Sequence, residues 1–458
     1  MTPTFLEMPA TGPPDAVRFP PVTRRRLDNG LAVWTLTDAA LPVVSAALVV
    51  PAGSAQDPAE RPGLVSLTGD MLDEGAGGRP AIELSEALAR LGSRLAIDIS
   101  PDVTAISIGA VDRRFAETLG LLADVVTRPH FQAADFERVR DLRVNRLKQL
   151  TQSVGTVADR AFATAVFGDH PYGHGTMGTT RSLEAMTLDE ARAAWERMYR
   201  PSTAILVVSG GVTEDEVMRA VKASALDRWE GPTTTDADRG ATDKAPDLVL
   251  KTPVIMLVNR PAAPQSELRV GHLGPPRHTP DYHALVTLNA VLGGQFTSRL
   301  NRNLRETRGI TYGARTVFDM QRSAGSFVCD TSVQADATAV AVREILGECR
   351  AIREPGAVAA DELALAQDSL TRGYVRHFET AAQFTRALVE LATYDLPLDT
   401  FDRFVPEVTA VGAEALARVG ATALRPDACA AVVVGDAATC RSSLEALGLP
   451  VIDADPEF

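Results

Sequence analysis

The sequence contains an internal repeat whose period is half the chain, and this repeat constrains the fold more than any other feature. An Arg-Pro turn at Arg200 leads into an apolar run at residues 205–208, and an Arg-Pro turn at Arg425 leads into a similar run at residues 430–434. Proline ends a helix and β-branched residues favour a strand, so both copies predict a helix end followed by a strand. The two arginines are 225 residues apart in a chain of 458 residues, which predicts two similar α/β domains.

Each half of the chain has the pattern of strands first and helices after. Residues 30–37 and 42–50 are apolar runs separated by polar residues, which indicates neighbouring antiparallel strands. Residues 84–91 then carry apolar side chains at helical spacing. The second half repeats this order, with a strand at 254–258 and a helix at 281–292. We therefore predict the α+β class, with two homologous α/β sandwich domains in which helices cover a mainly antiparallel sheet.

A polar stretch separates the two predicted domains. Residues 231–247 have almost no apolar side chain to bury, which is typical of a linker. We place the linker at residues 236–246, between an N-terminal domain of residues 1–235 and a C-terminal domain of residues 247–458. Two long helices near the C-terminus are expected to cover the second sheet, at residues 359–379 and 381–393.

The charge and composition exclude several classes of protein. The formal net charge of −13 repels phosphate backbones and anionic lipids, so neither nucleic acid nor a membrane is an expected partner. No apolar run approaches the roughly 18 to 20 residues of a membrane helix, and residues 1–26 lack the order of a signal peptide. The cytoplasm is therefore the default location, with the periplasm as the alternative. The four cysteines form no C-x-x-C pair, which argues against a zinc knuckle.

Several stretches resemble the pitrilysin or insulinase-type zinc peptidases, a family that includes the mitochondrial processing peptidase. In this family each half of the chain is one α/β domain, in agreement with the repeat, and two subunits can close like a clamshell. The resemblance runs through most of the chain, and its most specific stretch is LRETRGITYG at residues 304–313. The other similar stretches are LDNGL at 27–31, PAGS at 51–54, PGL at 62–64, FGDHPYG at 167–173 and GGQFTSRL at 293–300.

Active members of this family carry an inverted zinc motif, H-x-x-E-H, on the helix that follows the Pro-Gly-Leu stretch. Residues four apart share a helix face, so two imidazoles can hold one Zn²⁺ while the glutamate between them activates a bound water. The matching positions here are Ser66, Gly69 and Asp70, so both histidines and the glutamate are missing. The third ligand of active relatives is a glutamate on a later helix, where this chain shows Asn145 and Arg146. We expect no metal in this chain, and a self-sufficient metallopeptidase with an unusual ligand set around Asp70 is a further alternative.

The resemblance also implies a pair of functional residues in the second half. In this family an arginine and a tyrosine seven residues apart complete the active site from the C-terminal domain, and Arg305 and Tyr312 stand at that spacing. A guanidinium can hold a substrate carbonyl with two donors, and a phenol can donate to the oxyanion that develops on the scissile carbonyl. Arg308 competes with Arg305 for the substrate role. The structural alternative is that Arg305 pairs with Glu306 or another neighbour and that Tyr312 is an ordinary half-buried strand aromatic.

A chain with the arginine and tyrosine but no zinc motif resembles the non-catalytic subunit of heterodimeric bacterial relatives. This resemblance implies a 1:1 heterodimer with a homologous subunit that carries the H-x-x-E-H motif and the zinc. Arg305 and Tyr312 would then act in trans on unfolded peptides held between the two subunits, and the chain alone would be inactive. The alternative is a scaffold or core subunit of a larger assembly without a role in peptide cleavage.

Overall fold

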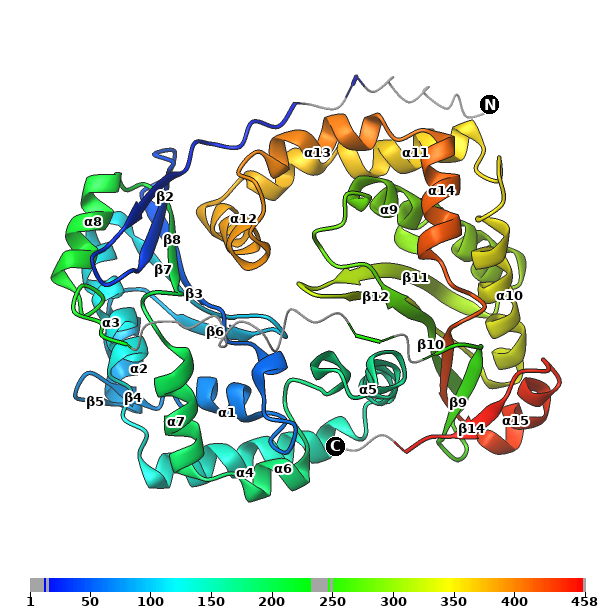
Figure 1. Ribbon diagram of the computed structural model, residues 1–458, viewed down its shortest axis with the longest axis horizontal. Helices are drawn as coiled ribbons and strands as arrows, with labels where there is room; N and C mark the ends of the chain where they lie inside the picture. Colours follow the sequence, from blue (N-terminus) through cyan, green and yellow to red (C-terminus); the bar gives the residue numbers. More distant parts are fainter. Residues whose placement is uncertain (1–11, 14–15, 232–245, 248–249, 456–458) are drawn as a thin grey trace, which may run out of the picture.

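The computed structural model describes residues 12–13, 16–231, 246–247 and 250–455. Most of the predicted linker at 236–246 lies outside these residues. Each half forms a mixed six-stranded sheet with helices around it, so the predicted α+β class and the two similar domains are confirmed (Figure 1). No helix in the described part of the chain is long and apolar enough to cross a bilayer.

The first sheet has the strand order β1-β2-β8-β3-β7-β6. β2 and β8 are parallel, and the other neighbours are antiparallel. Two short strands, β4 (Gly75–Ala76) and β5 (Arg79–Pro80), pair separately. The bounds are β1 Thr23–Arg26, β2 Ala32–Thr37, β3 Val43–Val50, β6 Leu95–Ile99, β7 Thr104–Val111 and β8 Ile205–Gly210.

The second sheet has the strand order β11-β12-β10-β13-β9-β14. β9 runs parallel to β13, as β2 runs parallel to β8, so the central part of the strand order is the same in both sheets. The sheets differ at one edge, where β14 joins β9 in parallel and β1 joins β2 in antiparallel fashion. The bounds are β9 Val254–Asn259, β10 Gln265–Gly274, β11 Thr311–Met320, β12 Gly325–Gln334, β13 Ala430–Gly435 and β14 Val451–Asp453.

The helices follow the strands in both halves, and several begin at capping boxes such as the one between Thr187 and Glu190. The first half contains α1 Leu64–Asp70, α2 Ala81–Arg90, α3 Phe115–Thr127, α4 Ala133–Leu150, α5 Val154–Phe167, α6 Thr180–Ala185, α7 Leu188–Met198 and α8 Glu214–Ala223. The second half contains α9 Tyr282–Asn289, α10 Thr338–Ala351, α11 Ala360–Thr371, α12 Ala381–Tyr394, α13 Thr400–Thr409, α14 Ala413–Ala423 and α15 Ala437–Glu445.

Most of the predicted elements are present, but one helix is shorter than expected. The apolar runs form β2, β3 and β9, the helical stripe forms α2, and α9 continues as a π-helical turn to Gly294. The helix predicted at 359–379 is wrong beyond Thr371, where a short 3₁₀ turn at Tyr374–Phe378 follows. This turn lets the Tyr374 ring stack on Phe404 at a centroid distance of 4.1 Å. Aromatic packing therefore replaces the continuation of the helix.

The two halves exchange one helix each. α12 was predicted to cover the second sheet, but it packs on β3 and β8 of the first sheet, where Phe384 and Leu388 meet Ala47 and Val207. In return α5 packs on β10 and β13 of the second sheet (Figure 1). Both sheets are therefore covered on both faces, which explains why strands such as β3 and β13 are almost continuously apolar.

A buried carboxylate joins the two domains at the turn between β6 and β7. Asp102 accepts hydrogen bonds from the phenol of Tyr172 at 2.5 Å and from the backbone N–H of Arg322 at 3.0 Å, in the turn between β11 and β12. Burial, together with the hydrogen bond to Asp102, raises the pKa of Tyr172 well above its ordinary value. A second link is the ion pair between Arg269 and Asp159 at 2.6 Å. These contacts fix the relative placement of the two domains.

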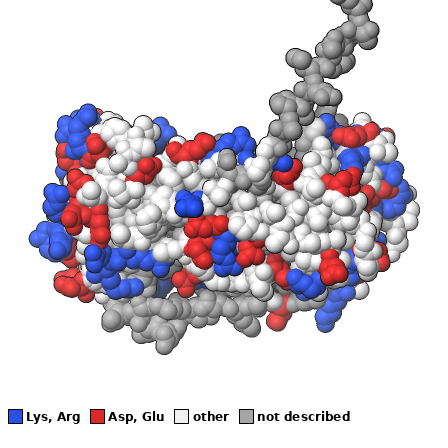
Figure 2. All heavy atoms as spheres, turned by 90° about the horizontal axis from the view of Figure 1, so that it is seen from above, with Lys and Arg blue, Asp and Glu red and all other residues white. Residues whose placement is uncertain are grey.

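Charged side chains of both signs lie on the surface of the molecule. Acidic and basic side chains are interspersed over the face seen in Figure 2.

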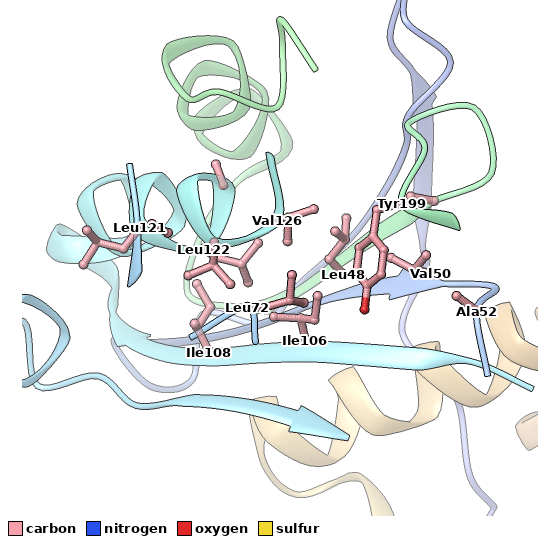
Figure 3. Packing of buried hydrophobic residues seen from close by; sticks show 14 of the residues in the cluster. Leu48, Val50, Ala52, Leu72, Ile106, Ile108, Leu121, Leu122, Val126 and Tyr199 are labelled. Atoms are coloured by element: carbon pink, nitrogen blue, oxygen red, sulfur yellow. The ribbon is translucent and has the colours of Figure 1, made fainter. Parts of the chain in front are cut away.

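The core of the first domain lies between its sheet and the helices α1, α3, α7 and α8. Figure 3 shows part of this core and labels Leu48, Val50, Ala52, Leu72, Ile106, Ile108, Leu121, Leu122, Val126 and Tyr199.

Candidate functional site

The helix that corresponds to the zinc motif, α1, is held at its start by a buried carboxylate and two glycines. Asp57 accepts hydrogen bonds from the backbone N–H groups of Gly63 at 2.6 Å and Val65 at 2.8 Å. Gly63 has φ = +94°, and a Cβ there would lie 2.7 Å from the backbone of Gly178, so only glycine fits. Burial raises the pKa of Asp57 to about 7, although the backbone hydrogen bonds act in the opposite direction.

The face of α1 that would bind a metal binds a guanidinium instead. The Nη2 atom of Arg143 donates to Ser66 Oγ at 2.8 Å, and its Nη1 atom forms an ion pair with Asp70. The Arg143 side chain comes from α4 and is only 7% exposed. Two of the three motif positions are therefore engaged by one buried cation.

The third motif position has no space for a side chain without rearrangement. A Cβ on Gly69 would lie 2.4 Å from the Cδ1 atom of Ile99, so Ile99 of β6 fills the place of the missing base. Among the described residues, no three His, Cys, Asp or Glu side chains are grouped so that they could hold a metal ion. A hydroxyl and a carboxylate that already bind a guanidinium are a poor ligand set for zinc. The residues at this place do not fit a zinc ion.

The sequence pointed to Asn145 and Arg146 as the residues opposite the motif, but both are exposed on α4. The side chain that reaches α1 is Arg143, two residues earlier. The buried face of α4 consists of Phe136, Val139, Arg143, Val144 and Leu147. A charged residue within an apolar helical stripe was the signal that could have identified Arg143 from the sequence.

The second constellation lies on a π-helical turn, Asn301–Thr307, and on β11. Arg305 is half-buried in this turn, and its guanidinium carbon lies 3.8 Å from the centroid of the Phe296 ring. Tyr312 is 93% exposed, so it is not the half-buried strand residue of the structural alternative. Phe296 is itself 65% exposed. The structure therefore presents a guanidinium and two aromatic rings to solvent.

Arg308 points toward a different neighbour. Its Nε atom donates to Asn303 Oδ1 at 2.8 Å, and its guanidinium forms an ion pair with Glu344 of α10 at 2.9 Å. These contacts engage two of the three guanidinium nitrogens of Arg308, which favours Arg305 for contact with a substrate. Sequence reasoning missed Phe296 as the neighbour of Arg305.

The motif positions and the Arg-Tyr pair belong to different domains. In the described part of the chain, no hydrogen bond or ion pair joins Ser66 or Asp70 to Arg305 or Tyr312. In the first group, Arg143 pairs with Asp70, and Ile99 fills the space beside Gly69. The second group has a guanidinium and a phenol, which are donors suited to binding and polarising a carbonyl.

Comparisons with known proteins give the context of these two groups. The family model described as Insulinase (Peptidase family M16) matches residues 33–180, and the one described as Peptidase M16 inactive domain matches residues 185–370. An uncharacterized zinc protease of Mycobacterium leprae is 26% identical over 371 residues, which are 80% of each chain. A protein named as the non-peptidase homolog YmxG of Helicobacter pylori is 20% identical over 293 residues, which are 62% of this chain and 65% of that protein.

Two solved structures share the fold. The structure titled as a peptidase M16 inactive domain from Pseudomonas fluorescens has a TM-score of 0.83 at 23% identity, covering 91% of this chain and 98% of that one. The structure titled as a protease from Helicobacter pylori has a TM-score of 0.84 at 16% identity, covering 91% of this chain and all of that one. At these identities the likeness establishes the fold alone.

Proposed function

The chain belongs to the insulinase (M16) family of zinc peptidases, whose models together match more than two thirds of it, and from this membership we propose that it is a non-catalytic subunit. It supplies Arg305 and Tyr312 to the active site of a homologous partner subunit that carries the H-x-x-E-H motif and the zinc. The substrate is an unfolded peptide, because the peptide backbone has to be accessible to both side chains. The chain alone has no peptidase activity.

The contact that carries this proposal is the guanidinium of Arg143 on Ser66 and Asp70. A buried cation on this face takes the place that a metal cation has in active relatives, and a second cation beside it would be repelled. Ile99 fills the place of the general base. The hydroxyl of Ser66 and the carboxylate of Asp70 thus both have a partner within the chain, as a structural role requires.

The exposed pair in the second domain supports a retained role in catalysis. A fully exposed tyrosine and a guanidinium without a buried partner do little for stability, so their geometry is better suited to an external ligand. Arg305 orients the peptide through its backbone carbonyl. Tyr312 donates its phenolic proton in a hydrogen bond to the oxygen that gains negative charge during hydrolysis.

The names of relatives support the two halves of the proposal separately. One relative is named as a non-peptidase homolog, and the profile over residues 185–370 is described as an inactive domain. Other relatives are named as zinc proteases. A chain that is similar to both kinds is a reasonable partner in a peptidase that contains one zinc-bearing and one zinc-free subunit.

The first test is metal content. We expect elemental analysis of the purified, dialysed chain to find no stoichiometric zinc, because the motif residues do not fit the ion. About one zinc per chain that is lost on Asp70→Ala would contradict the proposal and would favour a self-sufficient metallopeptidase.

The second test is reconstitution with a homologue from the same genome that carries the H-x-x-E-H motif. Size-exclusion chromatography with light scattering should show a 1:1 heterodimer, and only the mixture should hydrolyse an unstructured peptide. A lone monomer of this chain in the mixture would contradict the assembly. Heterodimer formation with full activity in both Arg305→Ala and Tyr312→Phe would instead indicate the scaffold role.

A further inference from the structure

We propose that Asn301 is a positioning residue that holds Tyr312 in its exposed orientation and couples it to the turn that carries Arg305. This inference rests on the proposed function, because the orientation of Tyr312 matters for activity only if the tyrosine takes part in the reaction. No part of the sequence pattern around residue 301 indicates this role.

The alternation of β11 would bury Tyr312 if the strand were regular. Ala314, Thr316 and Met320 are buried on the face of β11 that packs on the domain core. Side chains two residues apart lie on the same face of a strand, so residue 312 belongs to that buried face by period. Its 93% exposure therefore requires a departure from regular geometry.

A β-bulge provides this departure. Thr311 pairs with Val333 and Ala314 pairs with Thr331, so Tyr312 and Gly313 together oppose the single residue Ser332. A bulge adds one residue to one strand and turns the side chains next to it. It also removes backbone groups from the ladder, and these groups need other partners.

Hydroxyl groups satisfy one side of the bulge. The backbone N–H of Gly313 donates to Thr311 Oγ1 at 3.1 Å, and the hydroxyl of Thr331 donates to the Gly313 carbonyl at 2.9 Å. The hydroxyl of Thr311 donates to the carbonyl of Ser332 at 2.7 Å. The residues that directly flank the bulge on both strands thus hold it in place.

Asn301 satisfies the other side of the bulge from outside the sheet. Its Oδ1 atom accepts from the backbone N–H of Ala314 at 2.9 Å, and its Nδ2 atom donates to the carbonyl of Ala314 at 2.9 Å. The same Nδ2 atom lies 3.1 Å from Ser298 Oγ. Asn301 is only 6% exposed, so few water molecules could replace these bonds. Its amide group takes the place of a neighbouring strand at Ala314.

Asn301 is also the first residue of the π-helical turn on which Arg305 lies. One side-chain amide therefore links the turn that carries the arginine to the strand position next to the tyrosine. π-helical turns and β-bulges are both frequent at functional sites, where they aim side chains. Here they occur side by side, and Asn301 connects them.

The test uses the reconstituted heterodimer and the variants Asn301→Ala, Asn301→Asp and Tyr312→Phe. Asn301→Ala should lower kcat about tenfold, because a misplaced group loses transition-state stabilisation, while KM changes less than about twofold. Gln367→Ala is the matched control, since the Gln367 amide in α11 also bonds to backbone carbonyls, those of Val408, Thr409 and Val411. The control should keep full kcat.

Asn301→Asp adds a readout that a merely structural residue would not give. A protonated carboxyl group can donate to and accept from Ala314 as the amide does, whereas an ionised one can only accept. The kcat of this variant relative to the unchanged chain should therefore be highest at the lowest pH at which the heterodimer is active, and should fall as pH rises. A pH-independent ratio would overturn the proposal.

A measurement on the chain alone separates this inference from the proposed function. The amide of Ala314 should exchange with deuterium faster in Asn301→Ala than in the unchanged chain, because it loses its acceptor. Full kcat in Asn301→Ala together with a large loss in Tyr312→Phe would overturn the role of Asn301 and leave the proposed function intact. Full activity in Tyr312→Phe would overturn both.

Discussion

The first and second domains share one strand plan, but the residues that match the zinc motif in the first and the arginine-tyrosine pair in the second differ in how they are placed. In the first domain, the α1 face is closed by Arg143 and by Ile99, so its polar groups have partners within the chain. In the second domain, a π-helical turn and a β-bulge keep Tyr312 exposed. In the first domain Ser66 and Asp70 thus have a partner within the chain, whereas in the second domain Tyr312 is open to solvent.

The two domains also differ in how these residues contribute to the stability of the fold. In the first domain the partly exposed Asp70 pairs with the buried Arg143, and Ile99 fills the space beside Gly69. In the second domain a bulge interrupts the ladder, the hydroxyls of Thr311 and Thr331 bond to the backbone around it, and Asn301 bonds to the neighbouring residue of the edge strand. The proposed function accounts for this interruption, because the bulge lies next to Tyr312 and the ring is exposed to a ligand.

The largest effect is expected from the role that the proposed function gives to the second domain in the partner's active site. Tyr312→Phe should lower the turnover of the reconstituted heterodimer by about 10²-fold to 10³-fold, or roughly 3 to 4 kcal/mol, because it removes a donor used mainly in the transition state. Arg305→Ala should raise KM as well, since a guanidinium that holds the peptide acts in both the ground and transition states. Steady-state kinetics on an unstructured peptide measures both. Unchanged zinc content and 1:1 assembly in the variants are the controls.

The next effect is a pH dependence of stability in the first domain. Because burial raises the pKa of Asp57 to about 7, the folded chain binds this proton more tightly than the unfolded chain. Stability from this group is therefore complete below about pH 4, the ordinary range of Asp, and is lost as pH rises through about 7, on the order of a few kcal/mol in total.

Urea denaturation between pH 4 and pH 8 measures this dependence, with Asp57→Asn as the comparison. The variant cannot ionise at this position, so its stability should change less with pH than that of the unchanged chain. Equal slopes of stability against pH in both chains would show that the Asp57 carboxyl is ionised throughout and acts as a simple helix cap.

A smaller effect is expected from the ion pair between Arg143 and Asp70 on the face of α1 that matches the zinc motif. Asp70→Ala leaves the buried guanidinium of Arg143 without its carboxylate, and this should lower the free energy of unfolding by about 2 kcal/mol. The full cost of a buried pair is not expected, because the Asp70 side chain is 42% exposed and water can partly replace it. The matched control is Asp141→Ala, which removes an exposed carboxylate that pairs with Arg140 on α4 and should cost less than about 0.5 kcal/mol.

More of the fold than of the candidate site could be predicted from the sequence. The repeat, the strand runs and the helical stripe predict β2, β3, β9 and α2, because burial on one or two faces leaves a periodic signal. The exchange of α5 and α12 between the sheets leaves no such signal, since periodicity shows which face of a helix is apolar but not which sheet it covers. The assignment of α12 to the second sheet failed for this reason.

The geometry of the site depends on tertiary contacts, which the spacing of residues along the sequence does not reveal. The motif positions Ser66, Gly69 and Asp70 could be identified by resemblance, but the cation that closes them comes from Arg143 on another helix. The exposure of Tyr312 was also beyond the sequence, because strand alternation places residue 312 on the buried face and only the bulge reverses this. Rules based on local sequence, such as strand alternation, failed where the structure departs from regular geometry.

The smallest effect is expected at Phe296, whose ring lies under the guanidinium of Arg305 at 3.8 Å. A cation-π contact at an exposed site contributes about 0.5 to 1 kcal/mol, so Phe296→Ala should raise KM about two- to fivefold, while Phe296→Tyr should not change it. The ring acts through the arginine and does not itself have to touch the peptide. Phe296→Ala should therefore have no further effect in an Arg305→Ala background, and an additive loss in the double variant would show that Phe296 binds the peptide directly.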